Sequence, residues 1–228
     1  MEEATNVLFS IGPLEVTGTV TTTWAIIAIL TLLSWFATRN LKEVPGPLQT
    51  AAEMAVGSLR SFFEGTLGKK YASKYFPILG TFFVFIVICN YSGILPGAGH
   101  IKGFAVPTAC LSVTAGLGVI AFFTTHVIGI RERGLGHYLA SFAKPLILVV
   151  LMLPLNILEQ FIRPMSLALR LYGNMYGEEN VTEQLYEIFP IGAPLIMNVL
   201  SLIFCLLQAI VFTMLLSIYI SEAVESEE

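Results

Sequence analysis

The sequence contains no aspartate and few charged residues of either sign. All sixteen acidic residues among its 228 are glutamates, and charged residues make up 12% of the chain against 55% hydrophobic ones. Soluble domains carry about twice that share of charge, so the composition predicts an integral membrane protein. Without aspartate a membrane aspartyl protease is excluded. Because acids outnumber the twelve basic residues, a nucleic-acid partner has no electrostatic basis.

Common enzyme signatures are also missing. The chain has no HExxH, GxSxG or GxxxxGK[ST] motif, so nothing indicates zinc-protease, serine-hydrolase or P-loop chemistry. Its three cysteines are far apart inside apolar runs, which is typical of buried thiols rather than of a disulfide framework or a metal site. His100, His126 and His137 fall at predicted loop or interfacial positions, and we interpret them as surface residues. We therefore expect no catalysis by this chain alone, no cofactor and no metal.

Apolar runs long enough to cross a hydrocarbon core of about 30 Å recur along the chain. They predict an all-α integral membrane protein of one membrane domain, with about five crossing helices, the last two long and tilted. The spans are expected at residues 20–38, 76–95, 106–130, 145–178 and 190–221. Residues 47–70 mix apolar and charged side chains at helical spacing, which predicts an amphipathic helix on the cytoplasmic membrane surface. Packing of this helix against a soluble partner is the alternative.

The distribution of lysine and arginine orients the spans. Residues 1–19 contain neither, whereas residues 39–74 contain six, so an outer N-terminal segment and a cytoplasmic first connection are expected. The start MEEATN does not resemble a cleavable signal peptide, and the absence of a transit peptide suits a bacterial plasma membrane. No basic residue follows Arg170, so only the alternation of successive spans across the membrane places an acidic outer loop at 178–187 and a cytoplasmic C-terminal tail, SEAVESEE, at 221–228.

The fourth span is too long for a perpendicular crossing. About 32 helical residues reach about 48 Å at 1.5 Å each, so we predict one steeply tilted helix, kinked near Pro164.

Arg170 lies inside this otherwise apolar span. An arginine at mid-bilayer costs about 2.5–3.5 kcal/mol on insertion scales, so it needs a partner or an aqueous cavity; snorkelling to a headgroup is the alternative. At about 100° per residue, Arg163 and Asn174 share its stripe. Glu159 returns to that stripe within about 20° if the helical phase persists through Pro164.

Other polar residues extend this pattern. Glu179, nine residues beyond Arg170, points to the opposite side of the helix. In the last span Ser201 and Gln208 are seven residues apart and share a face, and a buried glutamine usually bonds to a neighbouring helix. Acids and amides around one fixed cation suit the movement of small ions.

Three motifs resemble those of one family. RPMSLALRLYGNMYGEE at 163–179 closely resembles the signature of subunit a of F-type ATP synthases, the stator channel protein beside the rotor ring. LLQAIVF at 206–212 and NYSGILPG at 90–97 are similar to its other motifs. The resemblance implies a subunit that translocates protons, or sodium ions, through two offset half-channels against the c-ring, so that ion flow drives rotation and ATP synthesis. It implies the c-ring, the peripheral-stalk b subunits, indirectly the F1 sector, and the lipid bilayer as partners.

The resemblance also implies roles for single residues. Arg170 matches the essential stator arginine that faces the rotor carboxylates. Asn174 and Glu179 match polar residues of the outer half-channel, and Gln208 matches a glutamine near the arginine. Glu159 resembles the acid of the cytoplasmic half-channel, which some relatives carry one turn earlier.

Two departures from the family pattern concern the outer half-channel. Ser201 stands where some relatives have a histidine that pairs with the outer glutamate, and a hydroxyl cannot hold a proton in its place. Glu178 stands where many relatives have glycine, so it is a candidate for the missing titratable group.

Two other functions remain open. One is a self-contained ion transporter or channel, although inverted repeats and broken helices, which such folds commonly show, are not visible. The other is a membrane scaffold whose polar residues only hold helices together.

Overall fold

The structure is a computed structural model of the chain, and it describes residues 7–11, 14–39, 46–94, 105–141, 149–189 and 192–224. Its main elements are β1 (Val7–Ile11), β2 (Leu14–Thr17), α1 (Gly18–Arg39), α2 (Pro47–Tyr91), α3 (Leu111–Arg133), α4 (Leu135–Ser141), α5 (Val149–Ile188) and α6 (Ala193–Val224). Short 3-10 turns lie at Ser92–Ile94 and Pro107–Ala109. The long helices confirm the all-α membrane class. The antiparallel hairpin β1–β2, inside the predicted outer segment, was not predicted.

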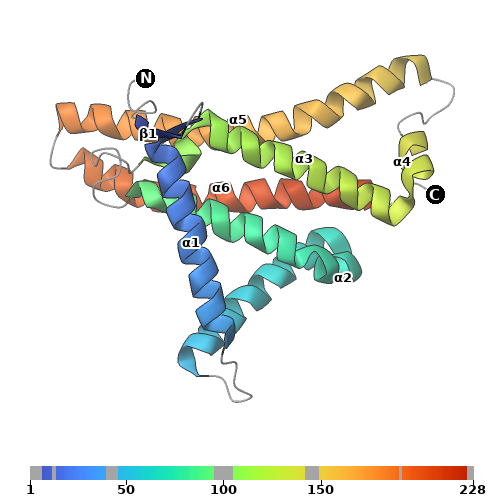
Figure 1. Cartoon of the computed structure of the whole chain (residues 1–228), viewed down its shortest axis with the longest axis horizontal. Helices are drawn as coiled ribbons and strands as arrows, with labels where there is room; N and C mark the ends of the chain where they lie inside the picture. The colour runs from blue at the N-terminus through green and yellow to red at the C-terminus, as the bar shows by residue number, and fades with distance from the viewer. Residues whose placement is uncertain are drawn as a thin grey trace.

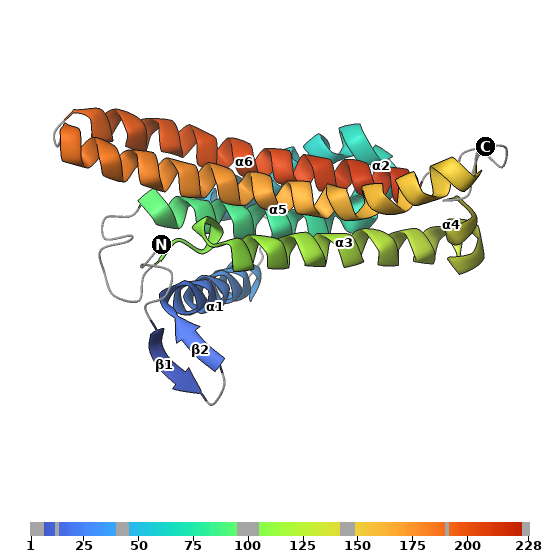
Figure 2. The ribbon, with the colours of Figure 1, turned by 90° about the horizontal axis from the view of Figure 1, so that it is seen from above.

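Three helices form the body of the molecule. α3, α5 and α6 contact one another and run along its long axis, while α1 crosses them steeply (Figure 1). α5 and α6 contact each other, and Figure 2 shows the hairpin projecting beside α1.

The core lies among α2, α3, α5 and α6. Fully buried residues recur along α6 every three to four positions, so they form one face of the helix. They are Cys205, Ala209, Phe212, Leu216 and Ile220. Phe82 of α2 stacks on Phe212 with ring centroids 6.0 Å apart.

The end of α2 is tied to α6 by the NYSG motif. The buried Asn90 amide donates from Nδ2 to the Cys205 carbonyl at 3.1 Å, and the Tyr91 hydroxyl donates to the Leu202 carbonyl at 3.0 Å. In a bilayer such interhelical hydrogen bonds contribute about 0.6 kcal/mol each on average. These two bonds hold α6, and therefore its polar residues, against the end of α2.

A sharp bend divides α2. Gly68 has φ 71° and ψ 156°, a backbone conformation that glycine adopts at little cost. Gly68 therefore separates α2 into two helical arms, one over most of the predicted surface helix at 47–70 and one that contains most of the span predicted at 76–95 (Figure 1). On the first arm Met54 and Val56 are more than half exposed, as an interfacial helix requires.

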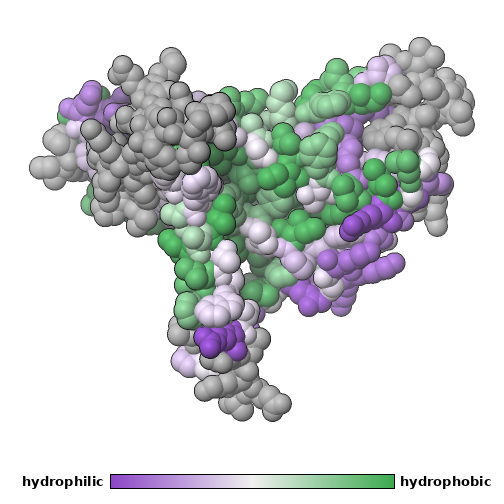
Figure 3. Space-filling model, viewed as in Figure 1, coloured by the Kyte–Doolittle hydropathy of each residue, from purple (hydrophilic) through white to green (hydrophobic). Residues whose placement is uncertain are grey.

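The outer faces of the helices are apolar. On α1, Trp24, Trp35 and Phe36 are more than half exposed, and Figure 3 shows apolar side chains across the middle of the helical body, with polar ones gathered near the bend of α2. Large exposed apolar patches are rare on soluble monomers, so this surface indicates a lipid environment.

Within the described ranges, four helices are long and apolar enough to cross a membrane, namely α1, α2, α3 and α6. α5 is long enough but carries charged residues along its length, so its crossing stays a prediction. Its 40 residues and the 32 of α6 correspond to about 60 and 48 Å. Both exceed the hydrocarbon thickness of about 30 Å, so a crossing requires a strong tilt.

The structure corrects the sequence prediction at both ends of this helix pair. α5 continues to Ile188, so the outer loop predicted at 178–187 is wrong and these residues are helical. α6 reaches Val224, so the start of the expected tail is also helical. Pro154 and Pro164 lie inside α5. The helix is nevertheless continuous from Glu159 to Glu179, as the predicted stripe of polar residues requires.

Candidate functional site

Polar contacts tie α5 to α6 at intervals along their antiparallel crossing, and we call this row of contacts the α5–α6 seam. Each contact joins one residue of α5 to one residue of α6. The pairs are Glu178 with Ser201, Asn174 with Gln208, and Arg163 with Glu222. The α6 members are separated by seven and fourteen residues, so they lie on one face of that helix.

The first two pairs form the outer half of the seam. The Ser201 hydroxyl donates to the Met197 carbonyl at 2.9 Å, and it lies near enough to the Glu178 carboxylate to favour its charged form. Asn174 donates from Nδ2 to Oε1 of Gln208 at 2.7 Å. Gln208 is only 5% exposed, and its Nε2 has no hydrogen-bond partner among the described residues. An unsatisfied buried donor costs about 1–3 kcal/mol, so Gln208 holds Asn174 at the expense of its own second donor.

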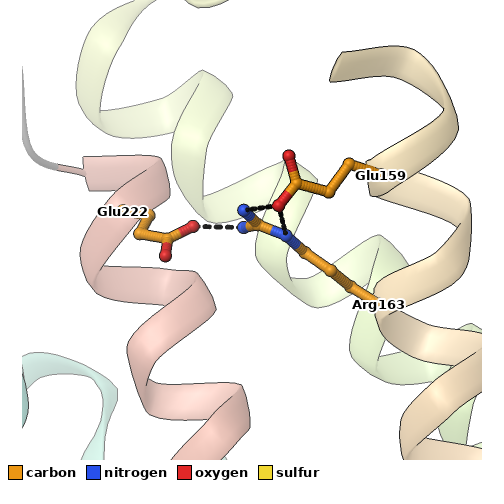
Figure 4. A network of polar contacts seen from close by, with 3 residues as sticks. All are labelled: Glu159, Arg163 and Glu222. Atoms are coloured by element: carbon orange, nitrogen blue, oxygen red, sulfur yellow. Dashed lines mark hydrogen bonds and ion pairs between the residues drawn. The ribbon is translucent and has the colours of Figure 1, made fainter. Parts of the chain in front are cut away.

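The third pair belongs to a charged cluster that we call the Arg163 triad, composed of Glu159, Arg163 and Glu222 (Figure 4). Nη2 of Arg163 lies 2.7 Å from Oε1 of Glu159, one turn earlier on α5, and Nη1 contacts the Glu222 carboxylate on α6. The guanidinium also lies 5.1 Å from the centre of the Tyr219 ring. The Glu159 and Glu222 side chains are 54% and 49% exposed, against 22% for Arg163, so solvent can reach both carboxylates.

Arg170 lies between the two halves of the seam. Its side chain is exposed, and it forms no ion pair with any described residue. Ser201 and Gln208 are seven residues apart on one face of α6, and the next position on that face, level with Arg170, is Leu215. Leu215 is apolar and packs against the core. The seam is thus interrupted by an apolar side chain beside an unpaired cation.

A small cavity lies behind the triad, between α3, α5 and α6. Its volume is about 20 Å³, enough for about one water molecule. Its polar lining consists of Thr125, His126, Gln160, Arg163 and Tyr219. His126 is half-buried, with its ring centroid 4.0 Å from that of Phe122, so the prediction that it is a surface residue is wrong.

The sequence matches the ATP synthase A chain family over residues 20–221. The chain belongs to this family. Among its relatives, ATP synthase subunit a 2 of Bradyrhizobium sp. is 39% identical over 219 residues, which cover 96% of this chain and 94% of the relative. ATP synthase subunit a 2 of Pelobacter propionicus is 36% identical over 228 residues, covering 100% and 96%. ATP synthase subunit a of Geobacter sulfurreducens is 38% identical over 204 residues, covering 89% and 86%.

The structure brings together four of the residues singled out from the sequence, and they form the outer half of the seam. Glu159 lies on the predicted stripe, but its carboxylate contacts Arg163 instead of Arg170. Glu179 is half-buried and, by helical phase, lies on the opposite side of α5 from Arg170.

Sequence reasoning missed Glu222. It had been assigned to the C-terminal tail, whereas α6 extends beyond it. The seven-residue series through Ser201, Gln208 and Leu215 was the signal that pointed to it.

Proposed function

We propose that this chain is the stator subunit of an F-type ATP synthase that passes protons, or sodium ions, along two offset half-pathways against the rotor c-ring. Ion flow would thereby drive rotation and ATP synthesis. As a family member the chain is a multi-pass membrane protein that associates with other ATP synthase subunits. Its proposed direct partners are the c-ring and the peripheral-stalk b subunits. Its proposed location is a bacterial plasma membrane, with the N-terminus outside and the C-terminus in the cytoplasm.

The unpaired state of Arg170 carries this proposal. A cation at membrane depth needs a partner, and no described carboxylate of this chain provides one. Arg163, seven residues earlier, contacts two carboxylates. A carboxylate of another chain, presented by the rotor, would supply what Arg170 lacks.

The surface around Arg170 supports the close approach of another helix. Ser166 and Gly173 on the same stripe are exposed, and Gly177 follows one turn after Gly173. A Cβ at either glycine would meet no atom within 4 Å. Small residues let helix backbones approach closely in membranes.

The chemistry follows from the charge of Arg170. A rotor carboxylate arriving from lipid is neutral, because a bare anion in hydrocarbon is too costly. Near Arg170 its anion is stabilised, since an opposite charge lowers the pKa of a carboxyl group. Arginine suits this role because it stays protonated in proteins. The ion leaves along one half of the seam, and the carboxylate takes another from the other half before it re-enters lipid.

The interruption of the seam explains how leakage would be avoided. The apolar Leu215 and the fixed cation Arg170 separate the outer pairs from the Arg163 triad, so the polar contacts of the described seam do not form one continuous row. Passage then requires the rotor, and flow is coupled to rotation. Each elementary charge that crosses 100 mV releases about 2.3 kcal/mol, so several must pass for each ATP made.

The test is ATP-driven acidification of inverted membrane vesicles that contain the whole complex, with ATP hydrolysis recorded in parallel. We expect Arg170→Ala to abolish pumping while the assembled complex remains in the membrane. Arg60→Ala, at an exposed arginine paired with Glu64, is the matched control and should pump normally. Pumping by Arg170→Ala near the wild-type level would refute the proposal and favour the scaffold. Ion flux through this chain reconstituted alone would favour the self-contained transporter.

A further inference from the structure

The Arg163 triad is built to exchange a cation with the cytoplasmic side. Its two carboxylates and one guanidinium sum to a formal charge of −1 (two negative, one positive). Uptake of one proton makes the triad neutral, so a bound proton leaves no isolated charge at the membrane edge. Both carboxylates are about half exposed, so water can deliver and remove that proton.

The position of the triad along the seam joins it to Arg170. Arg163 precedes Arg170 by seven residues, about 10.5 Å along the helix axis, and shares its stripe. On α6, Glu222 follows Leu215 by seven residues and continues the face that carries Gln208 and Ser201. The triad therefore occupies the end of the seam opposite the Glu178–Ser201 pair.

We propose that Glu222 is a second ion-exchanging carboxylate of the inner half-pathway, beside Glu159, and that Arg163 is the positioning residue that holds both carboxylates at its mouth. This inference rests on the proposed function. In the synthesis direction a proton leaves a rotor carboxylic acid near Arg170 and is taken up by one carboxylate of the triad. The triad then gives the proton to cytoplasmic water, and its charge returns to −1. In ATP-driven pumping the same transfers run in reverse.

Other titratable or charged groups also face the triad. Tyr219 on α6 lies within electrostatic range of both Arg163 and Arg170. His126 of α3 lines the cavity that Arg163 also lines. Tyr138 of α4 lies within electrostatic range of Arg163 and of Arg133. None of these adds an acid to the cluster, so its negative charge comes from Glu159 and Glu222.

The alternative is that the triad is only a clasp, meaning a set of ion pairs that fastens α6 to α5. Variants that change the net charge of the triad distinguish the two roles. Glu222→Gln leaves the triad with a charge of 0. The double variant Arg163→Gln/Glu222→Gln restores −1, because Glu159 is then the one charged member. If the triad exchanges ions, the pumping rate should fall in the single variant and recover in part in the double variant. If the triad is only a clasp, the pumping rate should not recover, because the double variant has lost one more contact.

The experiment measures the initial rate of ATP-driven proton pumping in inverted vesicles that hold the whole complex, over a range of external pH. In such vesicles the triad faces the external buffer. We expect Glu222→Gln to slow pumping several-fold, most at alkaline pH where protons are scarce, with ATP hydrolysis slowed in proportion. Glu222→Asp should pump at close to the wild-type rate, and the double variant should recover part of the loss. Glu187→Gln, at an exposed glutamate near the far end of α5, is the matched control.

Rates for Glu222→Gln that equal the wild type at every pH would overturn the inference. A double variant no faster than the single one, at equal complex content, would also overturn it in favour of the clasp. If Glu222→Gln reduces assembly of the complex, the pumping rates of Glu222→Asp and of the double variant, each compared with the wild type, test the inference instead. Arg170→Ala is measured alongside, because continued pumping by that variant would refute the proposed function itself, whatever Glu222 does.

Discussion

At the scale of single residues, the two arginines of α5 differ in their partners. Arg163 is held by carboxylates from two helices, whereas Arg170 stands exposed without an ion pair among the described residues. A paired guanidinium in a membrane fastens helices together. An unpaired one at membrane depth is costly, so it indicates a partner from another chain.

The contact between Glu178 and Ser201 gives a residue-scale prediction. Glu178 is half-buried and lies near the Ser201 hydroxyl, and its carboxyl group can hold a proton where a serine cannot. Glu178→Gln keeps the size and polarity of the side chain but removes the titratable group. We expect slower ATP-driven pumping at unchanged complex content, measured as acidification of inverted vesicles.

The control for this prediction is Glu183→Gln, at an exposed glutamate five residues further along the same helix. It should pump like the wild type. Equal rates for Glu178→Gln and the wild type would show that Glu178 does not carry the ion.

The sequence could largely predict which residues share one face of a helix. Helical spacing placed Asn174 with Arg170 and Ser201 with Gln208, because the angle between residues of one helix follows from their separation. The partner of each residue on another helix does not follow from local spacing. For this reason the pairing of Arg163 with Glu222 on α6 required the structure, whereas the pair Glu159–Arg163 is four residues apart on α5 and was within reach of helical spacing.

At the scale of elements, the crossing of α3 and α5 depends on one glycine. A Cβ on Gly118 would lie 2.9 Å from the Pro164 carbonyl oxygen and 3.1 Å from the Ala168 Cβ. Gly118 therefore allows α3 to approach α5 where Pro164 is located, close to the helical turns that carry Arg163 and Arg170.

Alanine substitution at two neighbouring glycines should have effects of opposite sign. Gly116 has open space at its Cβ, so Gly116→Ala should be neutral or stabilising by up to about 1 kcal/mol through helix propensity. Gly118→Ala forces the helices apart, and overpacking costs about 1–3 kcal/mol. Thermal denaturation of the purified complex measures both. Equal stability of the two variants would contradict this close packing.

The elements themselves were only partly predictable. Apolar periodicity located the long helices, because burial and lipid exposure both require apolar side chains. It could not locate the bend between the surface arm and the following span, since the bend depends on the positive φ of Gly68. The charged residues at 178–187 suggested a loop, yet α5 continues through them.

At the scale of the whole molecule, the two halves of the seam lie at opposite ends of the α5–α6 pair. The outer pairs lie toward the connection between α5 and α6, and the Arg163 triad lies toward the C-terminus (Figure 1). Because both helices are longer than the bilayer is thick, a strong tilt can bring each half to a different membrane surface while Arg170 stays between them.

Accessibility to a small membrane-impermeant thiol reagent tests this separation most directly. The background is the whole complex with Cys89, Cys110 and Cys205 of this chain replaced by alanine. Glu178→Cys should react only when the reagent is added from the outer side, and Glu222→Cys only from the cytoplasmic side. Reaction of either cysteine from both sides, or of both from the same side, would contradict two half-pathways that are separated at Arg170.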